Sequence, residues 1–187
     1  MLRIVTPGRS GSHVLFDCLN QNSTVSMAYA DVTHDISPTN KNKGEKVIFI
    51  TDDPRIVVRK IFAIKDRDLG FYSTHLSHMG ITPFPAEWTL SDYLDTGKDL
   101  MLLDARYTAW MYAPREPMAL LVTYQNLWEE HTWARIGKYL SIDTNIPETI
   151  QEKKESGLPE INTRYSQILD EMYEDLANLI KKEEASQ

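Results

Sequence analysis

Residues 2–16 read LRIVTPGRSGSHVLF, and this run carries more structural information than any other part of the chain. A short β-branched apolar segment breaks at Pro7-Gly8, and apolar residues then resume at helical spacing. A strand, a glycine turn and a helix N-terminus in this order direct free backbone N–H groups and the helix dipole toward an anion. Arg9, Ser10 and Ser12 add one positive charge and two hydroxyl groups. We therefore predict that the turn binds a phosphate- or sulfate-bearing ligand.

A simpler interpretation is that Pro7-Gly8 only ends a strand and that Ser10 only caps the following helix. The run also differs from two common nucleotide-binding loops. It lacks the lysine and the spacing of G-x-x-x-x-G-K-[ST], and it is not G-x-G-x-x-G. The sequence therefore disfavours ordinary ATP or GTP hydrolysis.

The composition is that of an ordinary globular protein, with 187 residues, 42% of them hydrophobic and 25% charged. We expect a single domain over residues 1–187. No run approaches the ~18 apolar residues that span a bilayer, so no membrane partner is expected. The single cysteine, Cys18, excludes an internal disulfide framework and a multi-cysteine metal site, and it favours a cytoplasmic location.

The net charge of −7 is unevenly distributed. Residues 143–187 contain 11 acidic and 5 basic side chains, so the part of the chain with the glycine turn is close to neutral. No broad basic region is present that would bind a nucleic-acid backbone. Local cationic sites for a small anion remain compatible with this pattern.

Apolar strands alternate with helical patterns along the chain, which is typical of an α/β fold with a parallel sheet. We predict a three-layer sandwich in which a central, mainly parallel sheet of about four strands is flanked by helices, in a P-loop-like arrangement. The predicted strands are residues 2–5, 25–29, 46–51 and 118–124. The predicted helices begin at the glycine turn and at about residues 54, 89, 99, 132 and 159, and residues 30–46 are expected to form a loop.

Ligands collect beyond the carboxyl ends of the strands in such sheets. Three segments at predicted strand ends carry a family resemblance. PGRSGS (residues 7–12) resembles the P-R-S-G-[ST]-T or P-K-S-G-T-T loop of the sulfotransferases. DDPRIVV (residues 52–58) is similar to their R-D-P-R-D-V-A-V-S segment, and YQNL (residues 124–127) is similar to their Y-E-D-L region. The chain therefore resembles the sulfotransferase family in three segments that occur in the family's order.

The resemblance implies transfer of a sulfuryl group from 3′-phosphoadenosine 5′-phosphosulfate to a hydroxyl or amine of a small-molecule or saccharide acceptor, without a metal. Arg9 would neutralise the leaving phosphate, and Gly8 would let the backbone approach the ligand closely. The residues implied to bind the donor are Gly8, Arg9, Ser10, Gly11, Ser12, His13, Arg55, Arg59 and Lys60.

The chain departs from the family pattern at the expected 3′-phosphate site. Asp52 stands where the family has an arginine, and a carboxylate there would repel a phosphate. Arg55, Arg59 and Lys60 lie further along the same predicted helix and would compensate, although the alternative is a solvated helix face. Residues 153–157 (KKESG) are at best a vague substitute for the family's C-terminal nucleotide loop.

A general base for the acceptor is expected near the second strand. Asp31 and His34 are the candidates for this role, and His34 has an ordinary pKa near neutrality. A loop histidine is also often simply exposed. His75 and His78 have a spacing that suits two metal ligands, but no third ligand is evident nearby.

Two other functional classes stay open. The first is a P-loop-like phosphotransferase or phosphoester-binding enzyme, which the presence of Asp52 favours. The second is a non-catalytic nucleotide-binding module, which the short chain and the altered 3′-phosphate site favour. An exposed acidic C-terminal helix could also serve as a contact surface in an oligomer.

Overall fold

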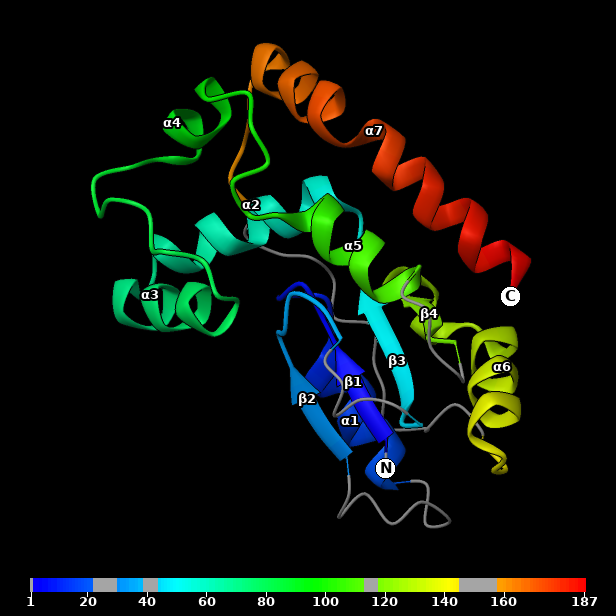
Figure 1. The fold of residues 1–187 in the computed structure, drawn as a ribbon. Helices are drawn as coiled ribbons and strands as arrows, with labels where there is room; N and C mark the ends of the chain where they lie inside the picture. Colours follow the sequence, from blue (N-terminus) through cyan, green and yellow to red (C-terminus); the bar gives the residue numbers. More distant parts are fainter. Residues whose placement is uncertain (1, 22–29, 39–43, 113–117, 145–157) are drawn as a thin grey trace.

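A computed structural model describes residues 2–21, 30–38, 44–112, 118–144 and 158–187. Its centre is a parallel sheet of four strands in the spatial order β2-β1-β3-β4 (Figure 1). The strands are β1 (Leu2–Val5), β2 (Ala30–Thr33), β3 (Lys46–Thr51) and β4 (Leu120–Thr123). In the register, Leu2 lies opposite both Ala30 and Lys46, and Ile48 lies opposite Leu120. The predicted α/β class and parallel sheet are thereby confirmed.

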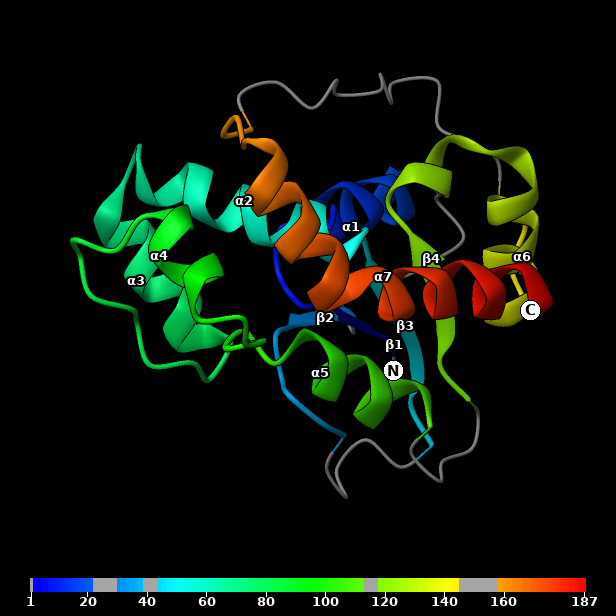
Figure 2. The same ribbon diagram turned by 90° about the horizontal axis from the view of Figure 1, so that it is seen from above.

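Helices cover both faces of the sheet (Figure 2). On one face, α1 (Ser12–Gln21) and α6 (Glu130–Leu140) pack against the sheet. The apolar cluster on the other face is formed with α2 (Pro54–Lys65), α3 (Leu69–His78), α4 (Leu90–Asp95), α5 (Leu103–Met111) and α7 (Thr163–Ser186). A short 3-10 helix, η3 (Gln125–Trp128), follows β4.

The apolar pattern of the central strands explains the two layers. In β3, Phe49 contributes to one apolar cluster, while Ile48 and Ile50 contribute to the other. Successive side chains of a strand point to opposite faces, so a continuously apolar strand is buried on both sides. The helix after this strand begins where the sequence predicts, because the Asp53 side chain accepts the N–H of Arg55 and Pro54 occupies the first helical position.

Three segments differ from the prediction. Residues 30–33 are predicted to form a loop but form the edge strand β2. Val32 is the one large aliphatic residue of this strand, so the sequence shows no alternation of apolar and polar residues there. Residues 69–78, for which the sequence predicts no helix, form α3. The expected helix at residue 99 begins only with α5, after Leu102 in a left-handed conformation (φ +56°). The predicted strand at residues 25–29 lies outside the described residues.

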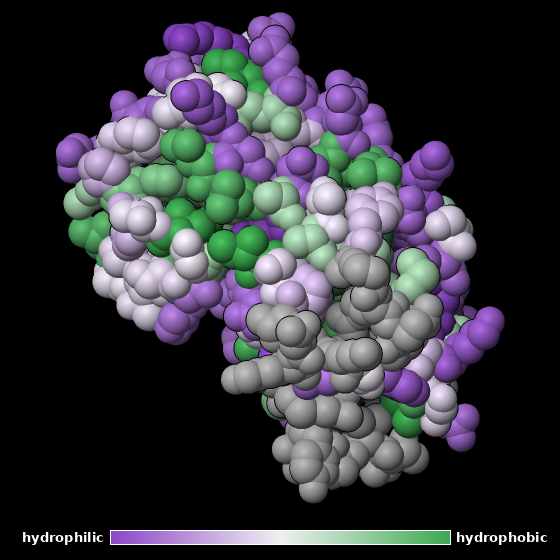
Figure 3. All heavy atoms as spheres, in the orientation of Figure 1, coloured by the Kyte–Doolittle hydropathy of each residue, from purple (hydrophilic) through white to green (hydrophobic). Residues whose placement is uncertain are grey.

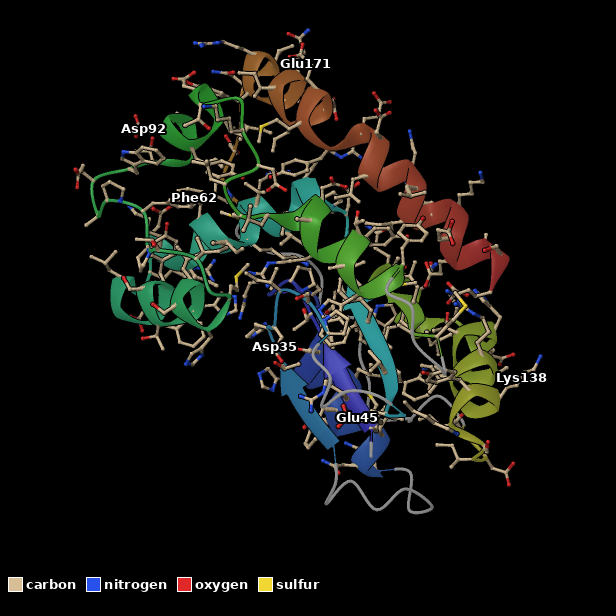
Figure 4. The ribbon with its side chains drawn as sticks, viewed as in Figure 1. Asp35, Glu45, Phe62, Asp92, Lys138 and Glu171 are labelled. Carbon is tan, nitrogen blue, oxygen red and sulfur yellow. The ribbon has the colours of Figure 1, made fainter. Side chains whose placement is uncertain are left out.

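No helix in the part of the chain that the structure describes is long and apolar enough to cross a membrane. Exposed large apolar side chains include Leu69 and Phe71 of α3, and Figure 3 shows apolar residues gathered on this side of the molecule. The aromatic residues of the following segment pack inward. Phe84 stacks on Phe62 of α2, whose position is labelled in Figure 4.

The strand order puts the topological switch point of the sheet between β1 and β3, and the region beyond the strand ends at this point is called the crevice below. From β1 the chain enters α1 on one face of the sheet, and from β3 it enters α2 on the other. Loops that leave neighbouring strands toward opposite faces separate at the carboxyl end of the sheet, which is where open α/β sheets bind ligands. The loop after β1 (residues 6–11) and Asp52-Asp53 after β3 both lie at this point.

Candidate anion-binding site

The loop after β1 has an unusual backbone. Gly8, Arg9 and Gly11 all have positive φ angles, of +99°, +54° and +79°. Two internal hydrogen bonds fix this shape: the Thr6 hydroxyl accepts the N–H of Gly8 at 3.1 Å, and the Ser10 hydroxyl donates to the Gly8 carbonyl at 3.0 Å. A non-glycine residue in the left-handed region is strained, and such strain concentrates at functional sites.

Four consecutive main-chain N–H groups of the loop have no acceptor within the described part of the structure. Among the described residues, no acceptor contacts the main-chain N–H groups of Arg9, Ser10, Gly11 or Ser12. Helix α1 starts at Ser12, so the positive end of its dipole lies beside these groups. Successive N–H groups in a turn with left-handed residues form a concave site that suits an anion.

Both loop glycines are required by their neighbours as well as by their φ angles. A Cβ at Gly8 would lie 2.6 Å from Nε2 of His75 in α3, and a Cβ at Gly11 would lie 2.1 Å from Cδ2 of the Tyr124 ring. The loop is therefore held between α3 on one side and the segment after β4 on the other.

Basic side chains surround the loop. The Arg9 side chain is exposed at its surface and makes no hydrogen bond or ion pair with the described residues. Neighbouring atoms still remove part of the water around its guanidinium, and this desolvation, followed by the charge of Arg67, lowers the pKa of Arg9. His34, just beyond β2, donates from Nδ1 to the Thr6 carbonyl at 3.1 Å. Burial is the main cause that lowers the pKa of His34, and the charge of Arg106 adds to it. His34 is therefore neutral at pH 7, with Nε2 available to accept a proton.

His75 and Arg106 complete the basic surroundings from the helical layer. The His75 ring lies edge-on to the His34 ring, with 4.9 Å between ring centroids. Burial, followed by the nearby charges of His34 and Arg9, lowers the pKa of His75 to about 4. Arg106 of α5 donates to the carbonyl of His34 at 2.6 Å and to the carbonyl of Met79, which follows α3. Burial lowers the pKa of Arg106 to about 10.

At the end of β3, a carboxylate is neutralised by a lysine. Asp52 is completely buried and accepts from Nζ of Lys60 at 2.7 Å and from the N–H of Asp53 at 2.8 Å. The Lys60 ammonium also lies 4.8 Å from the centre of the Tyr124 ring, the same ring that covers Gly11. Lys60, which the sequence predicts to bind the donor, thus lies beside the crevice, where its charge is paired with that of Asp52.

The two arginines proposed for the same 3′-phosphate point elsewhere. Arg55 pairs with Asp53 at 2.5 Å and with Asp170 of α7 at 2.6 Å, and these hydrogen bonds raise its pKa. Arg59 donates to the carbonyl of Pro159 at 2.9 Å. Both side chains therefore connect α2 to the C-terminal part of the chain, and their role in binding a phosphate stays a prediction.

Of the other predicted site residues, some lie beside the loop and some lie outside the described part of the structure. His13 is an exposed residue in the first turn of α1, beside the loop. Asp31 lies within β2, opposite Arg3 in β1, and its side chain is outside the described part of the structure. Residues 153–157 are likewise not described. Asp35, labelled in Figure 4, lies just beyond β2. Burial lowers the pKa of Arg106, and the charges of Asp99 and then Asp35 partly offset this effect.

Comparisons of the chain with protein-family models, with curated proteins and with solved structures found no match.

The sequence does not predict that two residues, His75 and Arg106, lie beside the loop, whereas Tyr124 belongs to a segment that it does place at the strand ends. The available signal was Arg106, a charged residue among the apolar positions of its helix, where a buried charge needs specific partners. His75 was considered only as a metal ligand with His78. No group of three potential metal ligands occurs among the residues that the structure describes.

A pocket of about 480 Å³, lined by both polar and apolar residues, lies beyond β4. Glu184 of α7 lies in its wall, almost completely buried, and accepts from the N–H and the hydroxyl of Thr123, both at 2.7 Å. The lining also includes His131, Arg135 and Asp53. Because Asp53 follows β3, the pocket borders the same carboxyl edge of the sheet as the loop.

Proposed function

We propose that the chain is a sulfotransferase-like enzyme that uses 3′-phosphoadenosine 5′-phosphosulfate as donor. The observation that carries this proposal is the loop at residues 6–12, where unpaired N–H groups, a helix N-terminus and the unpaired charge of Arg9 converge at the crevice. The three segments that resemble the family supply the choice of a phosphosulfate over other anions.

The proposed chemistry assigns roles to residues around this loop. The N–H groups of residues 9–12 hold the phosphosulfate, and Arg9 stabilises the negative charge that develops on the leaving phosphate oxygen. The sulfur–oxygen bond to that phosphate breaks as a new bond forms to the acceptor oxygen or nitrogen. His34 is the proposed general base, because it is neutral at pH 7 and Nε2 can take the acceptor proton. Asp31 is the alternative base.

The acceptor is a hydroxyl or amine of a small molecule or saccharide. A cytoplasmic location is also part of this proposal and is supported by the single cysteine of the chain.

One observation favours a second candidate. Asp52 pairs with Lys60 where the sulfotransferase pattern requires a cation for the 3′-phosphate. This pair fits a phosphotransferase or phosphoester-binding enzyme, whose ligand has no 3′-phosphate. A non-catalytic nucleotide-binding module is the third candidate.

Calorimetric titration with adenosine 3′,5′-bisphosphate, beside ATP and AMP, separates the candidates. We expect tighter binding of the bisphosphate than of either other nucleotide. Tighter binding of ATP would contradict the sulfotransferase proposal and support the second candidate. Bisphosphate binding without sulfuryl transfer to any of a panel of phenols, amines and sugars would support the third.

A further inference from the structure

His75 is a buried polar side chain with an unused nitrogen next to the loop. It is 8% exposed, and Nε2 has no hydrogen-bond partner among the described residues. That nitrogen is directed at Gly8, because a Cβ placed there would lie 2.6 Å away from it. Leaving a buried nitrogen unpaired costs free energy, so native proteins usually satisfy such groups.

The groups that face His75 are basic. Arg9 comes from the loop, His34 from the segment after β2, His78 from α3 itself, and Arg106 from α5. The Phe71 ring also stacks on the His75 ring, with 5.9 Å between ring centroids. These basic groups come from four parts of the chain and disfavour one another's protonated forms. Together with the neighbouring N–H groups of the loop, they favour the binding of an anion.

We propose that His75 is a proton-linked anion-binding residue, which takes up one proton from solvent when a doubly charged oxyanion occupies the loop at residues 6–12. The inference rests on the proposed binding of an oxyanion in that loop. The inference adds His75 to the proposed oxyanion site and specifies its ligand class, because the site would favour sulfate-like and phosphate-like dianions over monoanions.

The proton uptake would result from a change in the electrostatic potential at the His75 imidazole. In the free protein, burial and positive neighbours keep the imidazole neutral near pH 7. A dianion at the loop reverses the sign of the local potential, so the imidazolium form becomes favourable. Binding and protonation are then coupled, and affinity increases as the pH falls. If the bound form titrates near the ordinary histidine value, affinity should rise about 10-fold or more between pH 8 and pH 5.

Inorganic sulfate is the probe, because it carries no proton that titrates over this pH range. Calorimetry at pH 6 in two buffers with different ionisation heats measures the protons taken up on binding. We expect proton uptake with the unmodified protein, binding without that uptake for His75→Gln, and unchanged uptake for the control Lys98→Gln, in which an exposed lysine after α4 is replaced. Equal uptake in the unmodified protein and His75→Gln, or no uptake in either, would overturn the inference.

A measurement on the unmodified protein covers the case in which His75→Gln does not fold. The ring C–H signals of the histidines, followed by NMR from pH 4 to 8, should include one with a strongly lowered pKa that sulfate raises. An unchanged pKa for that signal at saturating sulfate would contradict the inference.

A parallel titration with adenosine 3′,5′-bisphosphate separates this inference from the proposed function. Bisphosphate binding with the same proton uptake in the unmodified protein and His75→Gln overturns the inference alone. Sulfate binding with uptake that depends on His75, but without bisphosphate binding, overturns the sulfotransferase proposal alone. If neither anion binds, both are wrong.

Discussion

Arg9 combines a strained backbone with an unpaired charge, and this makes it the residue most sensitive to the proposed function. Its φ of +54° is kept by a loop whose internal hydrogen bonds come from Thr6 and Ser10. Because the side chain makes no hydrogen bond or ion pair with the described residues, removing it disrupts no such contact. Its loss should therefore affect ligand chemistry more than stability.

We predict that Arg9→Ala lowers the rate of sulfuryl transfer by about 10²- to 10³-fold, the usual effect of removing one group that stabilises transition-state charge. The melting temperature should stay close to that of the unmodified protein. Arg164→Ala is the matched control, since this arginine is an exposed residue of α7 paired with Asp95. Full activity of Arg9→Ala would remove Arg9 from the proposed mechanism.

The buried imidazole of His75 makes stability depend on pH. Its pKa is about 4 in the folded protein, compared with 6.5 for an ordinary histidine, so the unfolded chain binds more protons between these values. The free energy of unfolding should therefore decrease as the pH falls from 6.5 toward 4, by about 2 to 3 kcal/mol from this residue. Urea unfolding of the unmodified protein and of His75→Gln should show a smaller decrease in the variant. Equal decreases would show that another group is responsible.

At this scale the sequence predicts the loop but not its surroundings. The order of glycines, arginine and serines indicates an anion site, since loop and helix N-terminus are local in the chain. His75 and Arg106 become part of the site only because α3 and α5 pack beside the loop. No local pattern in residues 69–111 shows which loop those helices contact.

Among the helices and strands, α7 and β4 are joined by a buried carboxylate as well as by apolar packing and a hydrogen bond from the Leu121 N–H to the Gln187 side chain. Glu184 accepts from the N–H and the hydroxyl of Thr123 and from the Asn126 side chain, at 2.7, 2.7 and 2.8 Å. Arg135 lies 3.8 Å from the same carboxylate. These groups would be left without their partner if the carboxylate were removed.

We predict that Glu184→Ala lowers the free energy of unfolding by about 2 to 3 kcal/mol, because a buried N–H and a nearby cation lose their acceptor. Glu174→Ala, an exposed position of the same helix, should change it by less than about 0.5 kcal/mol. Chemical denaturation of both variants tests this, and equal values would mean that Glu184 does not attach the helix.

Elements with strong local signals are the ones that the sequence predicts well. Asp53-Pro54 marks the start of α2, and the Thr89 capping box marks the start of α4. The edge strand β2 was missed, because it is short and its pairing with β1 is a tertiary contact. The early start predicted for α5 was wrong, since residues 99–102 have helical composition but turn before the helix begins.

For the whole molecule, charge is the property that distinguishes the site from its surroundings. The chain has a net charge of −7, but the crevice collects Arg9, His34, His75 and Arg106. A bound dianion would therefore offset the charges of Arg9 and Arg106 and stabilise the folded state as a whole.

We predict that adenosine 3′,5′-bisphosphate at 100 times its dissociation constant raises the free energy of unfolding by about 2.7 kcal/mol. Thermal unfolding with and without the ligand measures this effect. AMP at the same concentration should give a smaller increase. An equal increase with both ligands would show that the 3′-phosphate contributes nothing to binding.

The contact of the Tyr124 ring with Gly11 also limits how the chain can diverge. With a Cβ at position 11 only 2.1 Å from the ring, the glycine could be replaced in a descendant only after position 124 had lost its aromatic side chain. Even then the φ of +79° would retain a cost. The order in which these two positions mutate is therefore set in advance, and substitutions at them should arise in pairs, with the tyrosine changing first.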